Sequence, residues 1–170
     1  MPSKVEASGN TATAGARGRS WWQELLLRGP GGSVPRRVAL TLLIAAGAGL
    51  IVYSGYIHLY LWGRQPYPYS AIPTIGPLFL LQGIVGILIG VLVVVTRRFF
   101  AVLLGLGFMV VSVAALVIDV QVGMFGFQDS WQAPYATGTL RYEIVGAVVL
   151  LIAAAVLAWP SVAARSWHRR

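Results

Sequence analysis

Four long apolar runs constrain this chain more than any other feature of its sequence. Each run contains at least 20 residues, and together they cover positions 38–62, 72–95, 99–120 and 140–159. Because an α-helix rises about 1.5 Å per residue, each run is long enough to cross a hydrocarbon core of about 30 Å. Membrane-barrel strands would alternate polar and apolar residues over about ten positions, and these runs do not. We therefore predict an all-α membrane protein, a bundle of four transmembrane helices over residues 38–160.

Basic residues are distributed unevenly around these runs. With four crossings, the segments before the first run, between the second and third, and after the fourth lie on one side of the membrane. That side holds eleven basic residues, whereas the other holds only Arg64 and Arg141. By the positive-inside rule, both termini are predicted to be cytoplasmic. One lysine against twelve arginines is typical of a GC-rich bacterial genome, so we expect a bacterial plasma membrane.

The segments that flank the bundle are short. Residues 1–19 lack hydrophobic periodicity and are predicted to form a disordered cytoplasmic tail. In residues 20–37, Trp21, Trp22, Leu25 and Leu26 can share one face of a short helix. Tryptophans beside arginines favour an amphipathic segment in the headgroup region, and an ordered linker packed on the bundle fits equally well. Residues 161–170 are predicted to form a basic cytoplasmic tail.

Composition and motifs exclude several function classes. The chain has no cysteine, which excludes disulfides, thiolate metal sites, iron–sulfur clusters and cysteine nucleophiles. Its formal charge of +8 accompanies no recognition motif, so no nucleic-acid partner is predicted. No phosphate-binding glycine loop, zinc-protease helix or GxSxG elbow is present, and the second histidine, His168, lies in the tail and cannot complete a b-type haem site. We therefore predict no cofactor, and an enzymatic role is left open but not favoured.

A few polar side chains interrupt the apolar runs and are the candidate site residues. They are His58 near the end of the first run, Gln82 about ten residues into the second, Asp119 near the end of the third, and Arg141 and Glu143 at the start of the fourth. Ionisable groups in membrane helices are costly and usually face protein or water. At 100° per residue, the histidine, the glutamine and the two carboxylic acids are in phase with small residues, which mark helix contact faces. We expect these four to point into the bundle.

Glycine spacing and loop length indicate how the helices pack. Gly76, Gly83 and Gly90 follow a heptad spacing, and Gly86 and Gly90 form a GxxxG match. Small residues at such spacings let membrane helices approach closely. We predict that this second helix is the central packing element, although the same face can serve a partner subunit. The turn at 96–98 is so short that the second and third helices must be antiparallel neighbours.

The polar residues allow two interpretations. If the first, third and fourth helices converge, His58, Asp119 and Glu143 form a cluster beneath the loops at 63–71 and 121–139. Such a cluster suits a divalent metal, a proton-linked cavity, or a quinol or lipid head group. Alternatively, the three residues and Arg141 neutralise one another and only lock the bundle. Mutual salt bridges in a dry bundle would favour the second interpretation.

Several local motifs occur together over about residues 38–160. They are the end of the first run, His58–Trp62, the entry to the second, Ile72–Gln82, the loop Gly123–Phe127, and Glu143 at the opening of the fourth. In these features the chain resembles a group of small four-helix membrane proteins of actinobacteria. The resemblance implies that His58, Gln82 and Glu143 belong to a family pattern. It implies an architecture and no activity.

Two hypotheses of different class follow. The first is a non-catalytic accessory or assembly subunit of a plasma-membrane complex, whose glycine-lined faces and aromatic loops dock other membrane subunits or a second copy. The second is a protein that binds or transports a small molecule, lipid or ion in a polar pocket near the outer face. A quinone-linked or lipid-modifying enzyme is retained only because four-helix bundles often host such sites.

Overall fold

The structure, a computed structural model, describes residues 20–167. Its elements are α1 (Trp21–Leu26), α2 (Val34–Gly63), the single 3-10 turn η1 (Tyr69–Ala71), α3 (Ile75–Thr96), α4 (Phe99–Gln121) and α5 (Ala136–Trp167). Helices α2 to α5 are each long and apolar enough to cross a membrane. These findings confirm the predicted all-α architecture with four helices of membrane-spanning length. The predicted tail at 1–19 and the end of the basic tail, 168–170, lie outside the described residues.

Two helices begin at positions that differ from the predicted ones, for local reasons. α3 begins at Ile75 rather than at 72, because Ile72 precedes Pro73 and is extended, with φ −90° and ψ 118°. α5 begins at Ala136 rather than at 140, and the Thr139 N–H already donates to the Tyr135 carbonyl at 2.7 Å. The first turn of α5 mixes small and polar residues, so apolar character does not mark its start.

Helices α2 and α5 also extend beyond their apolar runs. α2 begins at Val34 rather than at 38, and a proline occupies its first turn, where a helix has no use for the N–H that proline lacks. α5 continues past 159 to Trp167. Residues 34–37 and 161–167, predicted as flanking segments, are therefore helical extensions of the bundle.

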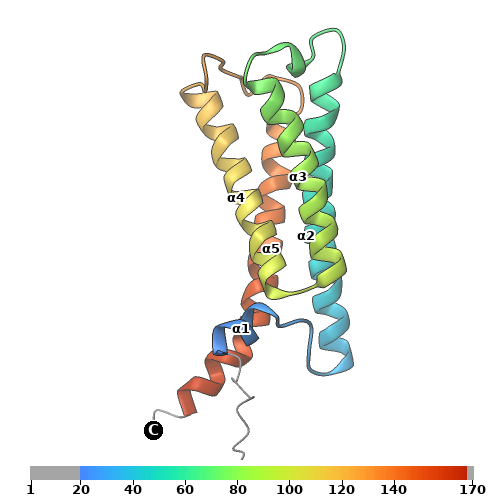
Figure 1. The fold of residues 1–170 in the computed structure, drawn as a ribbon, viewed down its shortest axis with the longest axis vertical. Helices are drawn as coiled ribbons and strands as arrows, with labels where there is room; N and C mark the ends of the chain where they lie inside the picture. The colour runs from blue at the N-terminus through green and yellow to red at the C-terminus, as the bar shows by residue number, and fades with distance from the viewer. Residues whose placement is uncertain (1–19, 168–170) are drawn as a thin grey trace, which may run out of the picture.

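The four long helices lie side by side along the long axis of the molecule (Figure 1). The α3–α4 turn, α1 and the last part of α5 are at one end, and η1 and residues 122–135 form the other, named the loop end below. α2 makes its most extensive contacts with α3 and α5, and α5 also packs closely on α4. α3 and α4 contact each other less, although only two residues separate them. They are antiparallel, as expected from the short turn, but α3 packs chiefly on α2.

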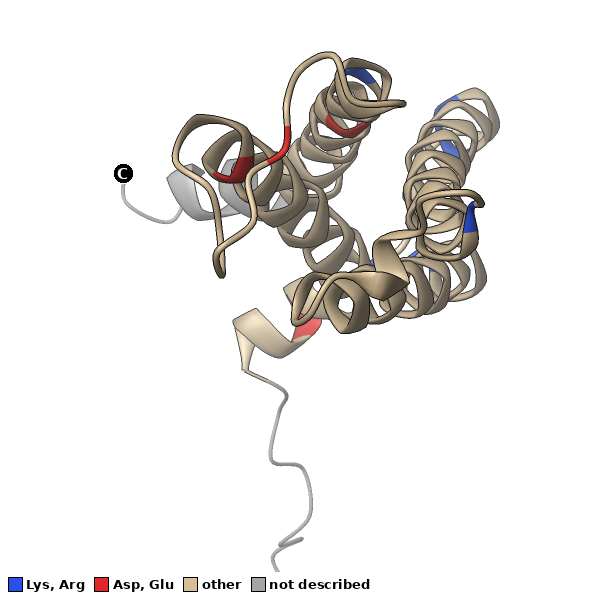
Figure 2. Ribbon diagram, turned by 90° about the horizontal axis from the view of Figure 1, so that it is seen from above, with Lys and Arg blue, Asp and Glu red and all other residues tan. Residues whose placement is uncertain are grey.

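The core fills the bundle between the α3–α4 turn and the middle of the helices. Its fully buried large side chains come from all four long helices and include Ile44, Ile51, Val93, Val102, Met109 and Leu150. Viewed from the loop end, charged residues occupy few positions along the ribbon (Figure 2). The core of this part of the bundle consists of buried apolar side chains.

Glycines bring α2 and α3 into backbone contact. A Cβ atom on Gly55 of α2 would lie 2.8 Å from the carbonyl oxygen of Gly83 and 3.1 Å from the main-chain nitrogen of Ile87. Gly86 and Gly90 of α3 are also buried. A Cβ atom on Gly86 would lie 3.2 Å from Cα of Gly55. Only residues without a side chain permit this approach of two helix backbones.

Gly76, the first glycine of the predicted heptad, packs elsewhere. It is buried, but a Cβ atom on it would lie 2.9 Å from the carbonyl oxygen of Ser70. This glycine therefore fits against η1 rather than against another long helix. The contact folds η1 onto the beginning of α3.

Helix α1 is attached to the end of the bundle opposite the loops. The Phe99 N–H donates to the Arg28 carbonyl at 2.8 Å, and Leu25 and Leu26 pack against the core. Trp22, on the other hand, is exposed over 48% of its surface. The segment is thus packed on the bundle as the linker interpretation requires, and its location in the headgroup region stays a prediction.

The glycine contact predicts a position-specific effect on stability. Gly55→Ala should lower the free energy of unfolding by about 1–3 kcal/mol, because the added methyl group meets main-chain atoms of α3 that cannot move aside. The matched control is Gly49→Ala in the same helix, where an added Cβ has no atom within 4 Å. Alanine is the better helix former, so the control should be neutral or slightly stabilising. Unfolding of the purified chain by denaturing detergent, followed by circular dichroism, measures both, and equal stability of the two variants would refute the contact.

Candidate functional site

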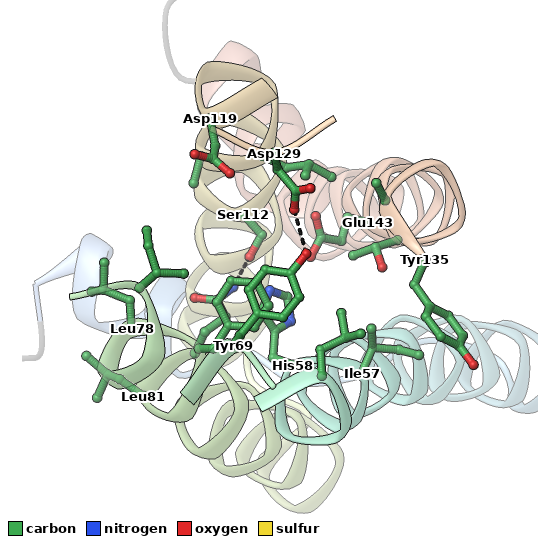
Figure 3. Close-up of a pocket in the computed structure, with 18 of the residues that line it drawn as sticks. Ile57, His58, Tyr69, Leu78, Leu81, Ser112, Asp119, Asp129, Tyr135 and Glu143 are labelled. Atoms are coloured by element: carbon green, nitrogen blue, oxygen red, sulfur yellow. Dashed lines mark hydrogen bonds between the residues drawn. The ribbon is translucent and has the colours of Figure 1, made fainter. Parts of the chain in front are cut away.

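A cavity of about 370 Å³ lies at the loop end of the bundle. Side chains from α2, α3, α4, η1, the loop 122–135 and the start of α5 line it, as Figure 3 shows. Most of the wall is apolar and includes Ile57, Leu61, Val85, Phe108, Ala115 and Leu116. The cavity lies where the core ends, between helices that are held apart.

The cavity opens sideways, between α3 and α4. Leu81 of α3 and Val111 of α4 both line it, yet they are exposed over 58% and 66% of their surfaces. These two residues mark what we name the mouth. In a helix of membrane-spanning length, an exposed apolar side chain in the middle of the helix faces lipid. The mouth therefore faces the hydrocarbon region when the bundle spans a bilayer.

The loop 122–135 and η1 close the cavity at the loop end. The Tyr69 hydroxyl of η1 donates to Oδ2 of Asp129 in the loop at 2.7 Å, a bond drawn in Figure 3. The Tyr69 ring stacks on Phe79 of α3 with centroids 4.3 Å apart. A tight turn, in which Phe125 and Gly126 have positive φ angles, folds the loop back before it reaches Asp129. η1, the loop 122–135 and the stacked rings of Tyr69 and Phe79 together cover the cavity, and we call them the roof.

Tyr69 remains a hydrogen-bond donor over the physiological pH range. Burial, the hydrogen bond to Asp129 and the negative charge of that carboxylate raise the pKa of Tyr69 above its ordinary value of 10.0. Each of these effects disfavours the phenolate form. The hydrogen bond from Tyr69 to Asp129 is therefore not lost by ionisation of the tyrosine near neutral pH.

Glu143 is the most deeply buried ionisable residue of the site. It is 1% exposed and lines the cavity from the first turns of α5. The Ser54 hydroxyl of α2 donates to Glu143 Oε1 at 2.7 Å, whereas Oε2 is buried with no hydrogen-bond partner. A buried acceptor without a donor costs about 1–3 kcal/mol, so the native chain tolerates a real penalty at this atom.

His58 lies one helical turn from Ser54 and has its tautomer set by the backbone. Its Nδ1 is 2.8 Å from the carbonyl oxygen of Ser54. A carbonyl can only accept a hydrogen bond, so Nδ1 carries the proton and, in the neutral ring, Nε2 is an acceptor. The imidazole packs beside Phe79, with ring centroids 5.1 Å apart, and lines the cavity.

Gln82 and Asp119 lie on the two helices that flank the mouth. The Gln82 side-chain amide of α3 donates to the Ser112 hydroxyl of α4, which bridges the helices where they diverge. Main-chain N–H groups of Met124 and Asp129 approach the Asp119 carboxylate from the loop. Its Oδ1 nevertheless is buried without a hydrogen-bond partner. Both residues line the cavity.

The structure brings together four of the five candidate residues and separates the fifth. His58, Gln82, Asp119 and Glu143 all line the cavity, whereas Arg141 does not line it and is exposed on α5. In the described part of the chain, Arg141 forms no ion pair with Asp119 or Glu143. The interpretation in which these residues neutralise one another is therefore not supported. The side chains that the structure describes, those of residues 20–159, also include no group of three histidine, aspartate or glutamate residues placed to hold a metal ion. A divalent metal therefore finds no ready-made ligand set there.

Several residues of the site escaped the sequence analysis. Ser54, Ser112 and Tyr69 were not among the candidate site residues. Asp129 and Thr139, which also line the cavity, were not singled out. The position of Ser54 four residues before His58 was an available signal, since both lie on one face of a helix. The partnerships of Tyr69 with Asp129 and of Gln82 with Ser112 join distant segments and carry no local signal.

Comparison with protein-family models, curated proteins and solved structures gave no match. The resemblance to the actinobacterial four-helix proteins thus stays an expectation. The geometry of the cavity alone carries the functional argument that follows.

The roof contact predicts a measurable change in loop dynamics. Tyr69→Phe removes the hydroxyl but keeps the ring stack, so the loop 122–135 loses its bond to η1. A hydrogen bond to a charged acceptor contributes about 1.5–3 kcal/mol, so amide hydrogen exchange in this loop should accelerate by roughly tenfold or more. Tyr67→Phe is the matched control, because Tyr67 is 89% exposed and lies in the same connection. Hydrogen exchange read by mass spectrometry decides, and unchanged loop exchange in Tyr69→Phe would show that the bond does not hold the roof.

Proposed function

We propose that this chain is a membrane-embedded binding protein for a small amphipathic molecule. The observation that carries the proposal is a cavity with apolar walls, open toward the lipid-facing surface and lined by the buried Glu143, one of whose oxygens has no partner. Binding sites for small molecules typically occupy about 300–1,000 Å³ and combine apolar walls with a few convergent polar groups. The cavity, at about 370 Å³, has both properties.

A purely structural role explains the polar residues less well. A carboxylate that served only to lock the bundle would gain most by pairing both oxygens, because each unsatisfied buried acceptor costs free energy. Glu143 pairs only Oε1, through Ser54. The Glu143 side chain lines the cavity, and its Oε2 has no partner, which is the arrangement expected of a site that a second molecule completes.

We further propose that both termini are cytoplasmic and that the loop end is external, in a bacterial plasma membrane. The proposal is supported by the arginines, most of which lie in the segments predicted to be cytoplasmic, and by the arrangement of the helices. α1, the Arg97–Arg98 turn and the last part of α5 lie at the same end (Figure 1), so one cytoplasmic surface accommodates all of them. The cavity then lies in the outer half of the membrane.

Cysteine labelling tests this orientation without background, because the chain has no cysteine of its own. Arg97→Cys, in the α3–α4 turn, should react with a membrane-impermeant maleimide only after the cells are opened. Tyr67→Cys, at the loop end, should react in intact cells. Labelling of position 97 from outside would reverse the orientation and place the cavity in the inner half of the membrane.

Filling the cavity should abolish binding. Ala115 of α4 lines the cavity, and its neighbour Ala114 is exposed and does not. Ala115→Phe should block saturable labelling by a photoreactive diazirine alkyl alcohol in lipid vesicles, because the ring occupies the space of the ligand. Ala114→Phe adds the same group on the lipid-facing side and should leave labelling unchanged. Peptide mapping of the wild type should place the label on cavity residues such as Val85 and Phe108.

A different pattern of labelling would contradict the proposed binding site. Labelling spread over all lipid-facing surfaces, without saturation and unaffected by Ala115→Phe, would refute a specific binding site. The accessory-subunit hypothesis rests on the sequence alone and stays a prediction, and the cavity argument does not depend on it.

A further inference from the structure

We infer that the ligand of this cavity is a lipophilic cation, an apolar body that carries an ammonium-type group able to donate hydrogen bonds. The inference rests on the proposed binding function and names the chemical class of its ligand. It follows from the sign of the charges around the cavity, from the kind of polar atoms left free there, and from their position relative to the mouth.

The charge of the cavity opposes that of the chain. The full sequence carries a formal charge of +8, yet the ionisable acids that line the cavity are Asp119, Asp129 and Glu143. No lysine or arginine is among the described residues that line it. Figure 2 shows the acidic positions of α4, the following loop and α5 at this part of the bundle. A buried carboxylate without a counter-charge is costly in a membrane, and a positively charged ligand would supply that counter-charge.

Among the described residues of the cavity, the buried side-chain atoms that lack a hydrogen-bond partner are acceptors. Three donors are paired within the protein, because Ser54 donates to Glu143, Tyr69 to Asp129, and the Gln82 amide to Ser112. Glu143 Oε2 and Asp119 Oδ1 are buried without a donor. The backbone-fixed tautomer leaves the neutral His58 ring with an acceptor at Nε2. A ligand group with several N–H donors complements this set, whereas an anion or a pure acceptor would leave every one of these atoms unpaired.

The position of Glu143 sets the orientation of the ligand. Figure 3 shows Glu143 on the side of the cavity opposite Leu78 and Leu81, with His58 between them and beneath Tyr69. A cationic group at Glu143 therefore leaves the apolar body to extend past His58 toward Leu78 and Leu81, on the side of the mouth. An organic cation fits better than a metal ion, since the described side chains, at residues 20–159, offer no group of three to hold one.

Three compounds with one apolar chain and different head groups test the inference. Decylammonium, decanol and decanoate should each be used to displace the photoreactive alcohol from the full-length protein in lipid vesicles, with concentrations expressed per lipid. Decylammonium should displace it at a concentration lower than decanol by about tenfold or more, because a charge-assisted hydrogen bond in a buried site is much stronger than a neutral one. Decanoate should be the weakest of the three.

Glu143→Gln should remove the preference for the cation. It keeps an acceptor for Ser54 but replaces the charged oxygen with a neutral amide, so decylammonium should weaken by roughly tenfold while decanol is unchanged. Arg141→Gln, on the exposed side of α5, is the control and should change neither value. Circular dichroism and size-exclusion chromatography establish that each variant is folded.

The outcomes separate this inference from the proposed function. If decanol or decanoate binds as tightly as decylammonium in the wild type, the cationic class is wrong although the binding site stands. If Glu143→Gln leaves the affinity for decylammonium unchanged, Glu143 does not recognise the cation and the inference fails. If none of the three compounds displaces the probe, the binding function itself fails. The wild-type ranking decides alone if Glu143→Gln does not fold.

Discussion

Close contact between α2 and α3 is the interaction on which the rest of the structure depends. Glycines on both helices let their backbones come into contact, and α3 packs on α2 over most of its length. Yet α3 is also joined to α4 by a two-residue turn. Small residues on facing helices allow close approach, and here they lie between α2 and α3. α3 packs on α2 and diverges from α4, and the cavity occupies the space that this divergence leaves.

The polar residues follow from the same geometry. Where the apolar core ends, the bundle must satisfy buried polar atoms with partners on other helices, because lipid supplies none. Ser54 and Glu143 join α2 to α5, and Gln82 and Ser112 join α3 to α4. The pairing is incomplete, with one oxygen each of Glu143 and Asp119 left without a donor. Because these buried oxygens lack hydrogen-bond donors, we assign the proposed binding site to the loop end of the bundle.

The two ends of the bundle are closed in different ways. At the end opposite the loops, leucines of α1 pack against the core, and Arg28, just after α1, accepts a main-chain hydrogen bond from the start of α4. At the loop end, the closure includes the side-chain hydrogen bond from Tyr69 to Asp129, the stacked rings of Tyr69 and Phe79, and a hydrogen bond from the Gln128 amide to the Val120 carbonyl. The cavity lies beneath this closure and beside the mouth.

The sequence by itself determined the class of the molecule. Four apolar runs of sufficient length admit only helices in lipid, and the helical phase of His58, Gln82, Asp119 and Glu143 was enough to expect them on inward faces. It did not determine helix ends such as Ile75 and Ala136, because apolar character does not report the local effect of Pro73 or of a short polar first turn. Only the tertiary structure decided that α3 packs on α2, that Arg141 stays outside, and that Glu143 meets Ser54 over an open space. Those outcomes depend on distances between helices, and these are set by the shapes of facing side chains far apart in the chain.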